Sequence, residues 1–421
     1  MRLDSTRTAL AVLAGVLAAV GSAAPCAAAD LRPLMRGVAE HWRAAQLADG
    51  ALPYGWDFMA DRDAGPSGDP WMYVVRQAGA FFFLAEYFDR TGDADAREPL
   101  VRGLRAIAAH SLPLGKAAAQ RWVEHTGILG LPVARWKLRV TLDSAGWLYR
   151  PEGPARVVSP DGRYSTALTG ATAVALLAEL AYAHASGDEQ FAGLREGWKQ
   201  ALVDLHVPGH GFRETPASID ESDYSNGEAW LALARYADRF PGDARVQATL
   251  ADTDAALMAR YSAAPSIKFH HWGAQAAAQR FRTTGDARYR TYLLAQGDVF
   301  LRRYARQLAA DENNCAAMEG IASIVGVLAA ADGPGEATTV ARDLRAWLDR
   351  ETAKLPRMQI QPGQTRLALG GDAYLQAPRL AAYAGDFLEG VYRPATRVDA
   401  SGHCLSAMVI MERAGLAGGP G

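Results

Sequence analysis

The segment "ARYADRFPGDARVQ" (residues 234–247) ends one helical stretch and begins another within a few residues. The glycine suits the left-handed residue that ends an α-helix, and the aspartate after it suits the N-cap of the next helix. Similar turns recur as "YFDRTGDADAREPL" (87–100), "AYAHASGDEQFAGL" (181–194), "AQRFRTTGDARYRTYL" (278–293) and, more loosely, "VLAAADGPGEATTV" (327–340). The repeat predicts antiparallel helical hairpins joined by tight turns.

Two classes of helix alternate between these turns. The first class is rich in alanine and apolar on most sides, and we expect it over residues 71–89, 166–185, 225–239, 271–284, 314–331 and 402–414. The second class is amphipathic and charged, and we expect it over residues 31–48, 94–110, 188–205, 243–260, 287–309 and 335–355. Six buried helices alternating with six half-exposed ones predict an all-α fold with an inner and an outer ring. An open helical solenoid is the alternative, and it would leave the inner helices less enclosed.

Two regions break the helical pattern. Residues 121–164 and 357–398 are rich in Gly, Pro and β-branched residues, and contain short alternating runs such as "WKLRVTL" and "RMQIQP". These features predict loops and small strands inserted between the hairpins of a single domain over residues 30–421. Long insertions in a compact repeat fold commonly shape a functional face.

The first 29 residues have the pattern of a secretory signal peptide. Arg2 and Arg7 give a basic start, an apolar run follows, and small residues precede Asp30 as a cleavage site would require. We therefore expect a periplasmic or secreted protein. We expect no stable membrane insertion after the signal peptide is removed, because no other stretch is long and apolar enough to cross a bilayer.

The overall charge is close to balance, with 44 Lys+Arg against 46 Asp+Glu. Phosphate binding needs a concentrated positive surface, so we do not expect nucleic acid as a partner. The hydrophobic content of 49% with 21% charged residues is typical of a globular protein with a large core.

In such a ring the inner helices run parallel, so their N-terminal ends gather on one face, which we call the mouth. Side chains at these ends are the candidates for a functional site, and the helix ends favour anionic groups there. We expect catalytic groups among Asp220, Glu221, Asp223, Tyr224, His270, His271, Glu319 and His403. We expect substrate-binding groups among Trp56, Asp57, Trp71, Tyr73, Arg76, Glu124, Trp272, Asn314, Arg397 and Asp399.

Helix starts are polar in most proteins, so structural roles compete with functional ones. Glu228 completes an S-x-x-E capping box, which assigns it to the start of a helix rather than to chemistry. Arg76 and Glu319 lie a turn or more inside apolar helices, where a charge is costly unless it is paired or used. The adjacent His270 and His271 are not needed for packing, and one of them suits a general acid or base near neutral pH.

Two cysteines remain after removal of the leader, Cys315 and Cys404, at the starts of neighbouring inner helices. An oxidising compartment favours a disulfide between them, and two unpaired buried thiols are the alternative. A metal site formed by these cysteines and His403 would lack the usual close ligand spacing, so we expect no metal and no other cofactor.

The repeat over residues 71–414 resembles that of the six-hairpin glycosidase-like (α/α)6 toroid superfamily. Within it, "HGFRETPASIDESDYSNGEAWLALARY" (210–236) is similar to a segment in the helical domain of glucuronyl C5-epimerases. The resemblance implies a carbohydrate-active enzyme whose partner is a polysaccharide or oligosaccharide.

Three chemistries fit the residues at the mouth. A glycoside hydrolase, which we favour, needs two carboxyl groups, for example Asp223 or Glu221 against Glu319 or Glu124. A polysaccharide lyase or uronyl epimerase would use the residue types of toroid lyases, here supplied by Asn314, Arg397, His271 and Tyr224. A non-catalytic polysaccharide-binding or assembly protein would use the aromatic residues alone.

Overall fold

The computed structural model describes residues 30–65, 68–114, 154–218, 220–329 and 336–417. The predicted signal peptide and most of the predicted insertion at 121–164 lie outside these residues. Among the described residues, no helix has both the length and the apolar character that a membrane span requires.

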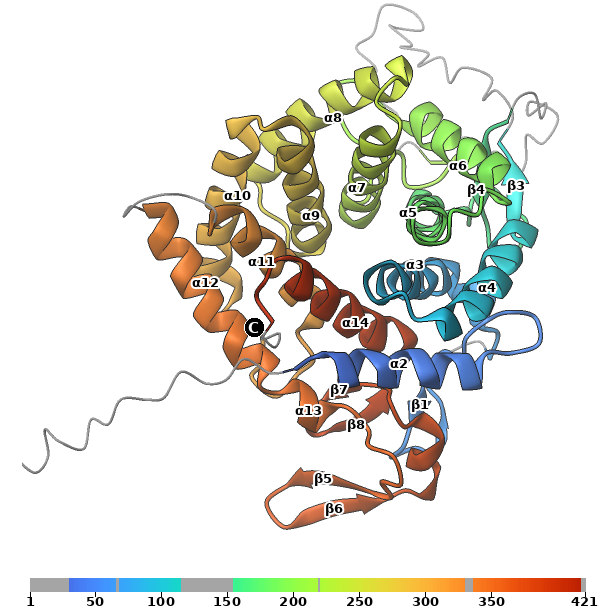
Figure 1. Ribbon diagram of the computed structural model, residues 1–421, viewed down its shortest axis with the longest axis vertical. Coiled ribbons are helices and arrows are strands. Elements are labelled where there is room, and N and C mark those ends of the chain that lie inside the picture. Colours follow the sequence, from blue (N-terminus) through green and yellow to red (C-terminus); the bar gives the residue numbers. More distant parts are fainter. Residues whose placement is uncertain (1–29, 66–67, 115–153, 219, 330–335, 418–421) are drawn as a thin grey trace, which may run out of the picture.

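Six helices form the inner ring: α3 (Val74–Thr91), α5 (Thr169–Ser186), α7 (Asp223–Arg239), α9 (Ile267–Thr284), α11 (Cys315–Leu328) and α14 (Val398–Arg413). Each packs against the next along the chain, and α14 packs against α3, which closes the ring (Figure 1). The predicted (α/α)6 toroid is therefore confirmed, and an open solenoid is excluded. Along α5 every residue from Thr169 to Ala183 is buried, because neighbouring helices surround it.

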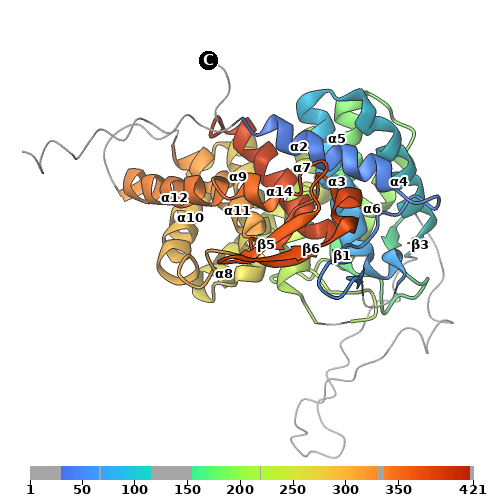
Figure 2. The ribbon, with the colours of Figure 1, turned by 90° about the horizontal axis from the view of Figure 1, so that it is seen from below.

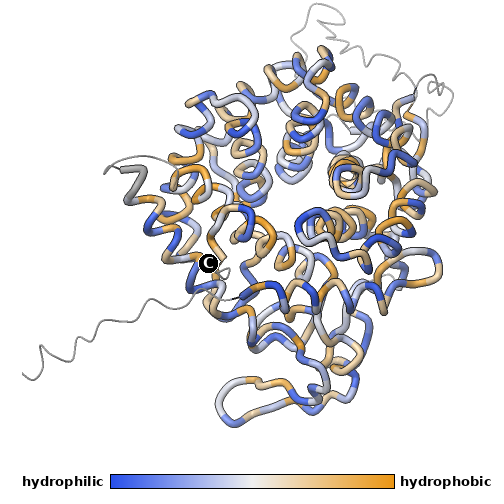
Figure 3. Tube along the Cα trace, viewed as in Figure 1, coloured by the Kyte–Doolittle hydropathy of each residue, from blue (hydrophilic) through white to orange (hydrophobic). Residues whose placement is uncertain are grey.

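The outer ring consists of α2 (Arg32–Ala45), α4 (Arg97–Ala109), α6 (Ala192–Leu205), α8 (Ala244–Ala263), α10 (Ala287–Val299) and α12 (Glu336–Thr352). Hydrophilic and hydrophobic residues alternate along helices such as α2 and α12, as expected for helices with one face on the core (Figure 3). Short helical segments extend this ring: η1 (Pro70–Tyr73), η2 (Ala94–Ala96), η5 (Phe300–Tyr304) and α13 (Leu355–Met358).

The Gly-Asp turns that join an inner helix to the next outer helix follow the predicted pattern in three of the four clear copies. Gly92, Gly187 and Gly285 end α3, α5 and α9 in the left-handed conformation, with φ of 68°, 67° and 68°. The turn after α7 differs, because the helix ends at Arg239, Phe240 and Pro241 follow it, and the glycine of the turn is not left-handed. Asp243 still caps α8, where its side chain accepts hydrogen bonds from two backbone N–H groups.

Small strands lie in the insertion at 357–398, as predicted. β7 (Leu388–Gly390) and β8 (Arg393–Thr396) join β1 (Trp56–Asp57) and β2 (Arg62–Asp63) in an antiparallel sheet of order β2-β1-β8-β7. The hairpin of β5 (Arg366–Gly370) and β6 (Ala373–Gln376) protrudes from the ring and is followed by η6 (Pro378–Tyr383) (Figures 1 and 2). At the other insertion, β3 (Ser111–Pro113) pairs with β4 (Arg156–Val158).

Cys315 and Cys404, for which the sequence favours a bond, form a disulfide in the structure. The bond joins the first residue of α11 to the second turn of α14 and links positions 89 residues apart. It therefore fixes two neighbouring inner helices to each other near the mouth.

Candidate active site

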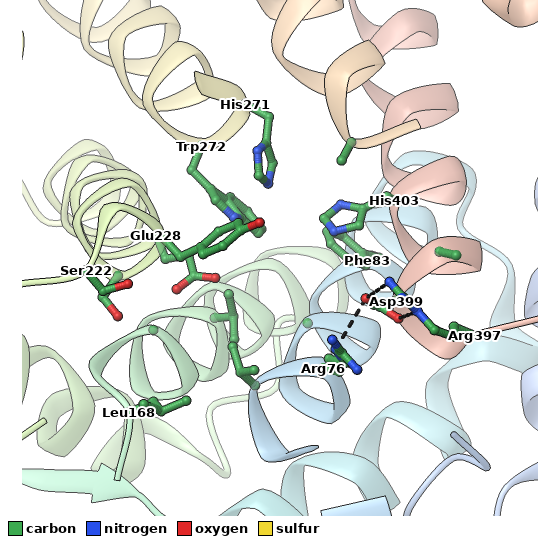
Figure 4. Close-up of a pocket in the computed structure, with 18 of the residues that line it drawn as sticks. Arg76, Phe83, Leu168, Ser222, Glu228, His271, Trp272, Arg397, Asp399 and His403 are labelled. Carbon is green, nitrogen blue, oxygen red and sulfur yellow. Dashed lines mark hydrogen bonds and ion pairs between the residues drawn. The ribbon is translucent and has the colours of Figure 1, made fainter. Parts of the chain in front are cut away.

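A cavity of about 580 Å³ lies where the N-terminal ends of the inner helices meet. All six inner helices contribute to its lining, together with β7 and β8 (Figure 4). The lining side chains that carry polar or aromatic groups include Arg76, Phe83, Tyr224, Glu228, His271, Trp272, Asn313, Glu389, Arg393, Arg397, Asp399 and His403. This is the part of the ring from which the sequence analysis draws its site residues.

Glu228 is the cavity residue that the capping-box argument assigned to a structural role. That assignment is wrong, because α7 begins at Asp223 and places Glu228 in its second turn, 5% exposed. Burial raises the pKa of Glu228 to about 7, against a smaller opposing effect of His403. No arginine or lysine among the described residues pairs with this carboxyl group. A carboxylic acid that keeps its proton near neutral pH can act as a proton donor.

The opposite helix leaves room for this carboxyl group. A Cβ atom on Gly170, in the first turn of α5, would lie only 1.8 Å from Glu228 Oε2. Any other residue at position 170 would therefore displace the Glu228 side chain. At this glycine α5 and α7 lie close together. The Glu228 carboxyl group is therefore buried between the two helices, and it still lines the cavity.

Asp399 lies across the cavity from Glu228 and has the opposite electrostatic environment (Figure 4). Arg397 donates two hydrogen bonds to its carboxylate, at 3.0 and 2.8 Å, and Arg76 Nε lies 3.3 Å from Oδ2. Burial alone would raise the pKa of Asp399, but the two arginines outweigh burial and lower it. The same cavity thus holds one carboxyl group that favours its proton and one that stays ionised.

His403 and Glu319 form a hydrogen-bonded pair in the cavity wall. His403 Nδ1 lies 2.9 Å from Glu319 Oε2, and Glu319 is fully buried behind the histidine. Burial raises the pKa of Glu319, and although burial by itself would lower that of His403, Glu319 and Asp399 raise it. The two groups therefore tend to hold one proton between them.

His271 faces His403 with ring centroids 5.4 Å apart. Burial, with smaller contributions from His403 and His270, lowers the pKa of His271 well below its usual value, so its ring is neutral. Trp272 stacks against Phe83 at 6.2 Å between centroids, so the indole forms part of a rigid floor. Tyr224 is 46% exposed and is the aromatic side chain in the lining with the most surface available to a ligand.

The acidic run before α7 does not reach the cavity, which corrects the prediction for Asp220, Glu221 and Asp223. Glu221 accepts hydrogen bonds from Arg260 at 2.6 Å and Asn226 at 3.1 Å. Asp220 is part of a turn in which its carbonyl accepts from the Glu214 backbone N–H at 2.8 Å.

Asp223 receives hydrogen bonds from Tyr261 at 2.8 Å and from Ser266 at 2.6 Å. Tyr261 is on α8, and Ser266 immediately precedes α9. These carboxylates hold the start of α7 against α8 and α9. Only Tyr224, among the four residues predicted in this run, lines the cavity.

His270 and Asn314 are also placed outside the cavity lining. His270 packs against Phe300 and Tyr304, and burial lowers its pKa to about 4. Asn314 donates to Glu351 Oε2 at 3.0 Å and so ties α11 to α12. Its neighbour Asn313 lines the cavity instead.

Trp56 and Asp57 belong to the small sheet rather than to the cavity. The Arg379 guanidinium lies 3.8 Å above the Trp56 ring, and the Asp57 carboxylate accepts from the Met59 backbone N–H. Neither residue lines the cavity, so both are corrections to the predicted binding set.

Trp71 and Tyr73 support the site without lining it. Trp71 Nε1 donates to Asp49 Oδ2 at 3.1 Å, and its ring is buried. The Arg76 guanidinium lies over the rings of Tyr54 and Tyr73, at 5.2 and 5.5 Å, which helps to aim it at Asp399. The remaining predicted residue, Glu124, lies outside the described residues.

Comparisons with known proteins agree with this architecture. No protein-family model matches the sequence, and neither does any curated protein sequence. Among solved structures, the α-1,6-mannanase GH76A from Salegentibacter sp. HEL1_6 aligns with a TM-score of 0.57 at 10% identity, covering 91% of this chain and 100% of the mannanase.

An inactive variant of that mannanase in complex with α-1,6-mannotriose aligns with a TM-score of 0.54, covering 92% of this chain and 100% of the variant. An unsaturated glucuronyl hydrolase specific for heparin aligns with a TM-score of 0.51 at 10% identity, covering 93% of this chain and 99% of the hydrolase. At this level of identity the alignments establish architecture alone. The chain shares the (α/α)6 toroid fold with these two hydrolases.

Proposed function

We propose that this protein is a glycoside hydrolase that acts on a polysaccharide or oligosaccharide bound at the mouth. The observation that carries the proposal is the pair of carboxyl groups in one cavity, Glu228 with its raised pKa and Asp399 with its lowered pKa. Glycosidases require a protonated acid and an ionised carboxylate on either side of the scissile bond, and different environments are what separate the two roles.

Glu228 is the general acid in this scheme. Its proton passes to the glycosidic oxygen as the bond to the anomeric carbon breaks. The oxygen of a water molecule forms the new bond to that carbon, and the proton that the water releases restores the acid form of Glu228. Asp399 supplies negative charge on the opposite wall, where positive charge develops on the sugar ring. Tyr224 is placed to contact a sugar face at the edge of the cavity.

The structural neighbours support the reaction class, because the mannanase and the glucuronyl hydrolase both cleave sugars. The details do not transfer from the mannanase. Its inactive variants replace two adjacent aspartates, and this sequence contains no two adjacent aspartates. The acid and the ionised carboxylate are therefore assigned from the cavity of this protein itself.

A lyase or uronyl epimerase is the second candidate, and the His403–Glu319 pair favours it. A histidine hydrogen-bonded to a buried carboxylate can remove a proton next to a sugar carboxylate, and Arg76 and Arg397 lie in the same cavity. Tyr224, whose pKa burial raises, would remain neutral and able to donate a proton.

One panel of assays separates these functions. Purified protein is incubated with neutral and acidic oligosaccharides and polysaccharides in deuterated buffer. New reducing ends without ultraviolet absorbance from an unsaturated uronate support the hydrolase, and that absorbance supports a lyase. Deuterium in an uncleaved sugar supports an epimerase. Tight binding without any of these changes would overturn the enzymatic proposal in favour of a carbohydrate-binding protein.

We also propose a periplasmic or secreted location. The signal-like pattern of residues 1–29 supports it, and a disulfide between Cys315 and Cys404 suits an oxidising compartment. N-terminal sequencing of the protein recovered from an exported fraction tests the proposal. A mature chain beginning at Asp30 is expected, whereas an unprocessed cytoplasmic chain would contradict it.

A further inference from the structure

Three inner helices bring two histidines and a glutamate together at one point of the cavity wall. His271 on α9, Glu319 on α11 and His403 on α14 each place one potential ligand atom so that all three atoms lie within 4.8 Å of one another. His271 and Glu319 are 48 residues apart in the sequence, and Glu319 and His403 are 84 apart, so no short sequence motif contains the cluster. The metal site considered from the sequence involved the two cysteines, which are instead bonded to each other.

Two atoms of the cluster are poorly satisfied by hydrogen bonds. His271 Nε2 and Glu319 Oε1 are buried and make no hydrogen bond of ordinary geometry to the described residues, although the Ser406 hydroxyl is near enough to Glu319 to lower its pKa. His271 is 6% exposed and Glu319 is fully buried, so solvent contact does not compensate for either atom. A buried polar atom without a partner is costly, and one cation between these side chains would satisfy both atoms.

The backbone around the cluster is fixed before any ligand arrives. Gly320, next to Glu319, lets α11 approach α9 closely, since a Cβ there would lie 2.9 Å from His271 Cα. The disulfide between Cys315 and Cys404 fixes α11 to α14 beside His403. The three side chains therefore stand on elements whose relative positions are already set, as a binding site requires.

The side chains suit a transition metal better than calcium or magnesium. Two imidazoles and one carboxylate form the ligand set of several catalytic zinc sites, whereas calcium and magnesium prefer oxygen ligands alone. His271 and His403 line the cavity, so coordination positions not taken by protein would face the space where a substrate binds. Asp399, in the same lining, adds negative charge nearby.

We propose that His271, Glu319 and His403 bind one divalent transition-metal ion, which takes the place of the hydrogen bond that His403 and Glu319 now share. The ion satisfies His271 Nε2 and Glu319 Oε1 and leaves open coordination positions toward the cavity. This site does not depend on the proposed hydrolase chemistry, since Glu228 and Asp399 are outside the cluster.

The test is direct metal binding by the full-length mature protein. After dialysis against a chelator, Zn²⁺ is titrated by calorimetry and bound metal is counted after gel filtration. One Zn²⁺ per chain is expected. Loss of a second-shell partner already weakens metal binding by about 10- to 100-fold, so Glu319→Gln and His271→Ala should each weaken it at least that much. Glu228→Gln, which removes a carboxyl group from the same cavity but outside the cluster, should bind as the wild type does.

Co²⁺ provides an independent readout, because ligation by imidazole and carboxylate produces visible absorption that free Co²⁺ does not show at the same strength. Circular dichroism establishes that each variant is folded. If one variant fails to fold, the metal stoichiometry of the wild type and the affinity of the other variant still test the proposal. Absence of stoichiometric Zn²⁺ binding to the wild type would overturn the proposal. Binding that is unchanged in both Glu319→Gln and His271→Ala would overturn it equally.

Discussion

The two ends of the toroid each hold a cavity, and a buried glutamate at each end has a different electrostatic environment. The cavity at the mouth measures about 580 Å³ and the one formed by the C-terminal halves of the inner helices about 610 Å³. Burial raises the pKa of Glu228 at the mouth to about 7, and none of the described arginines or lysines pairs with it. Glu86, on the C-terminal half of α3, accepts hydrogen bonds from Arg235 and Arg413 at 2.6 Å each, which lower its pKa despite complete burial.

Both glutamates are buried, so the presence or absence of an arginine partner determines whether the pKa is lowered or raised. Arg235 and Arg413 lie in the C-terminal halves of α7 and α14, where positive charge also interacts favourably with the negative ends of the helices. At the mouth, Arg76 and Arg397 both pair with Asp399, and no arginine or lysine of the described residues pairs with Glu228. A buried carboxyl group with a raised pKa, at the end of the ring where a cavity opens, is typical of a functional site.

Replacing Glu228 is expected to have the largest effect on activity. Glu228→Gln keeps the shape of the side chain but has no proton to donate, so kcat should fall by about 10²- to 10⁴-fold. The measurement is release of reducing ends from whichever oligosaccharide the panel identifies. Glu86→Gln, the matched change at the other end, should keep its activity under conditions where it is folded. A wild-type rate for Glu228→Gln would remove Glu228 from the chemistry.

Stability should show the reverse ranking. Glu86→Gln leaves Arg235 and Arg413 without their shared carboxylate in a buried setting, so the free energy of unfolding should fall by about 3 kcal/mol or more. Urea denaturation at neutral pH measures this. Glu412→Gln is the control, because Glu412 pairs with the more exposed Arg32 and Arg90 and should cost at most about 1 kcal/mol. Equal losses for both variants would contradict the difference between buried and exposed pairs.

The pH dependence of stability isolates Glu228 itself. In the folded state its pKa is about 7, against an ordinary value of 4.5, so between these pH values the folded protein holds a proton that the unfolded chain releases. The contribution of Glu228 to stability therefore falls as pH rises through this window, by at most about 3 kcal/mol, and is level above it. In urea denaturation, the free energy of unfolding of Glu228→Gln relative to that of the wild type should therefore rise by this amount between pH 5 and pH 8. Parallel curves for the two proteins would contradict the raised pKa.

The sequence predicted the fold because its signals are local. Alternating helix classes and Gly-Asp turns place every inner helix within four residues of its observed start, and three of the turn glycines adopt the expected conformation. Small errors at the starts mattered for the site. α7 begins at Asp223 rather than at residue 225, which moves Glu228 out of the cap and into the buried turn that faces the cavity.

The site residues that were missed depend on contacts from distant parts of the chain. Asp223 looks catalytic in the sequence, but its partners Tyr261 and Ser266 lie 38 and 43 residues away and hold it outside the cavity. Glu228 had a usable signal, since it is a charged residue inside an apolar helix, the same criterion that selected Glu319. The capping-box match outweighed that signal, and nothing local shows that α5 would present Gly170 against the carboxyl group.

Replacing Arg76 tests how Asp399 is kept ionised, and it is expected to have the smallest effect of these changes. Arg76→Ala removes one of the two arginines that lower the pKa of Asp399 and leaves Arg397 in place with both its hydrogen bonds. The acid limb of the pH–activity profile should therefore move to higher pH by less than about one unit, because a partly exposed ion pair contributes little. Arg76→Lys keeps the charge and should keep the limb near its wild-type position. A raised KM with an unmoved acid limb would show instead that Arg76 contacts the substrate and that Arg397 alone holds Asp399 ionised.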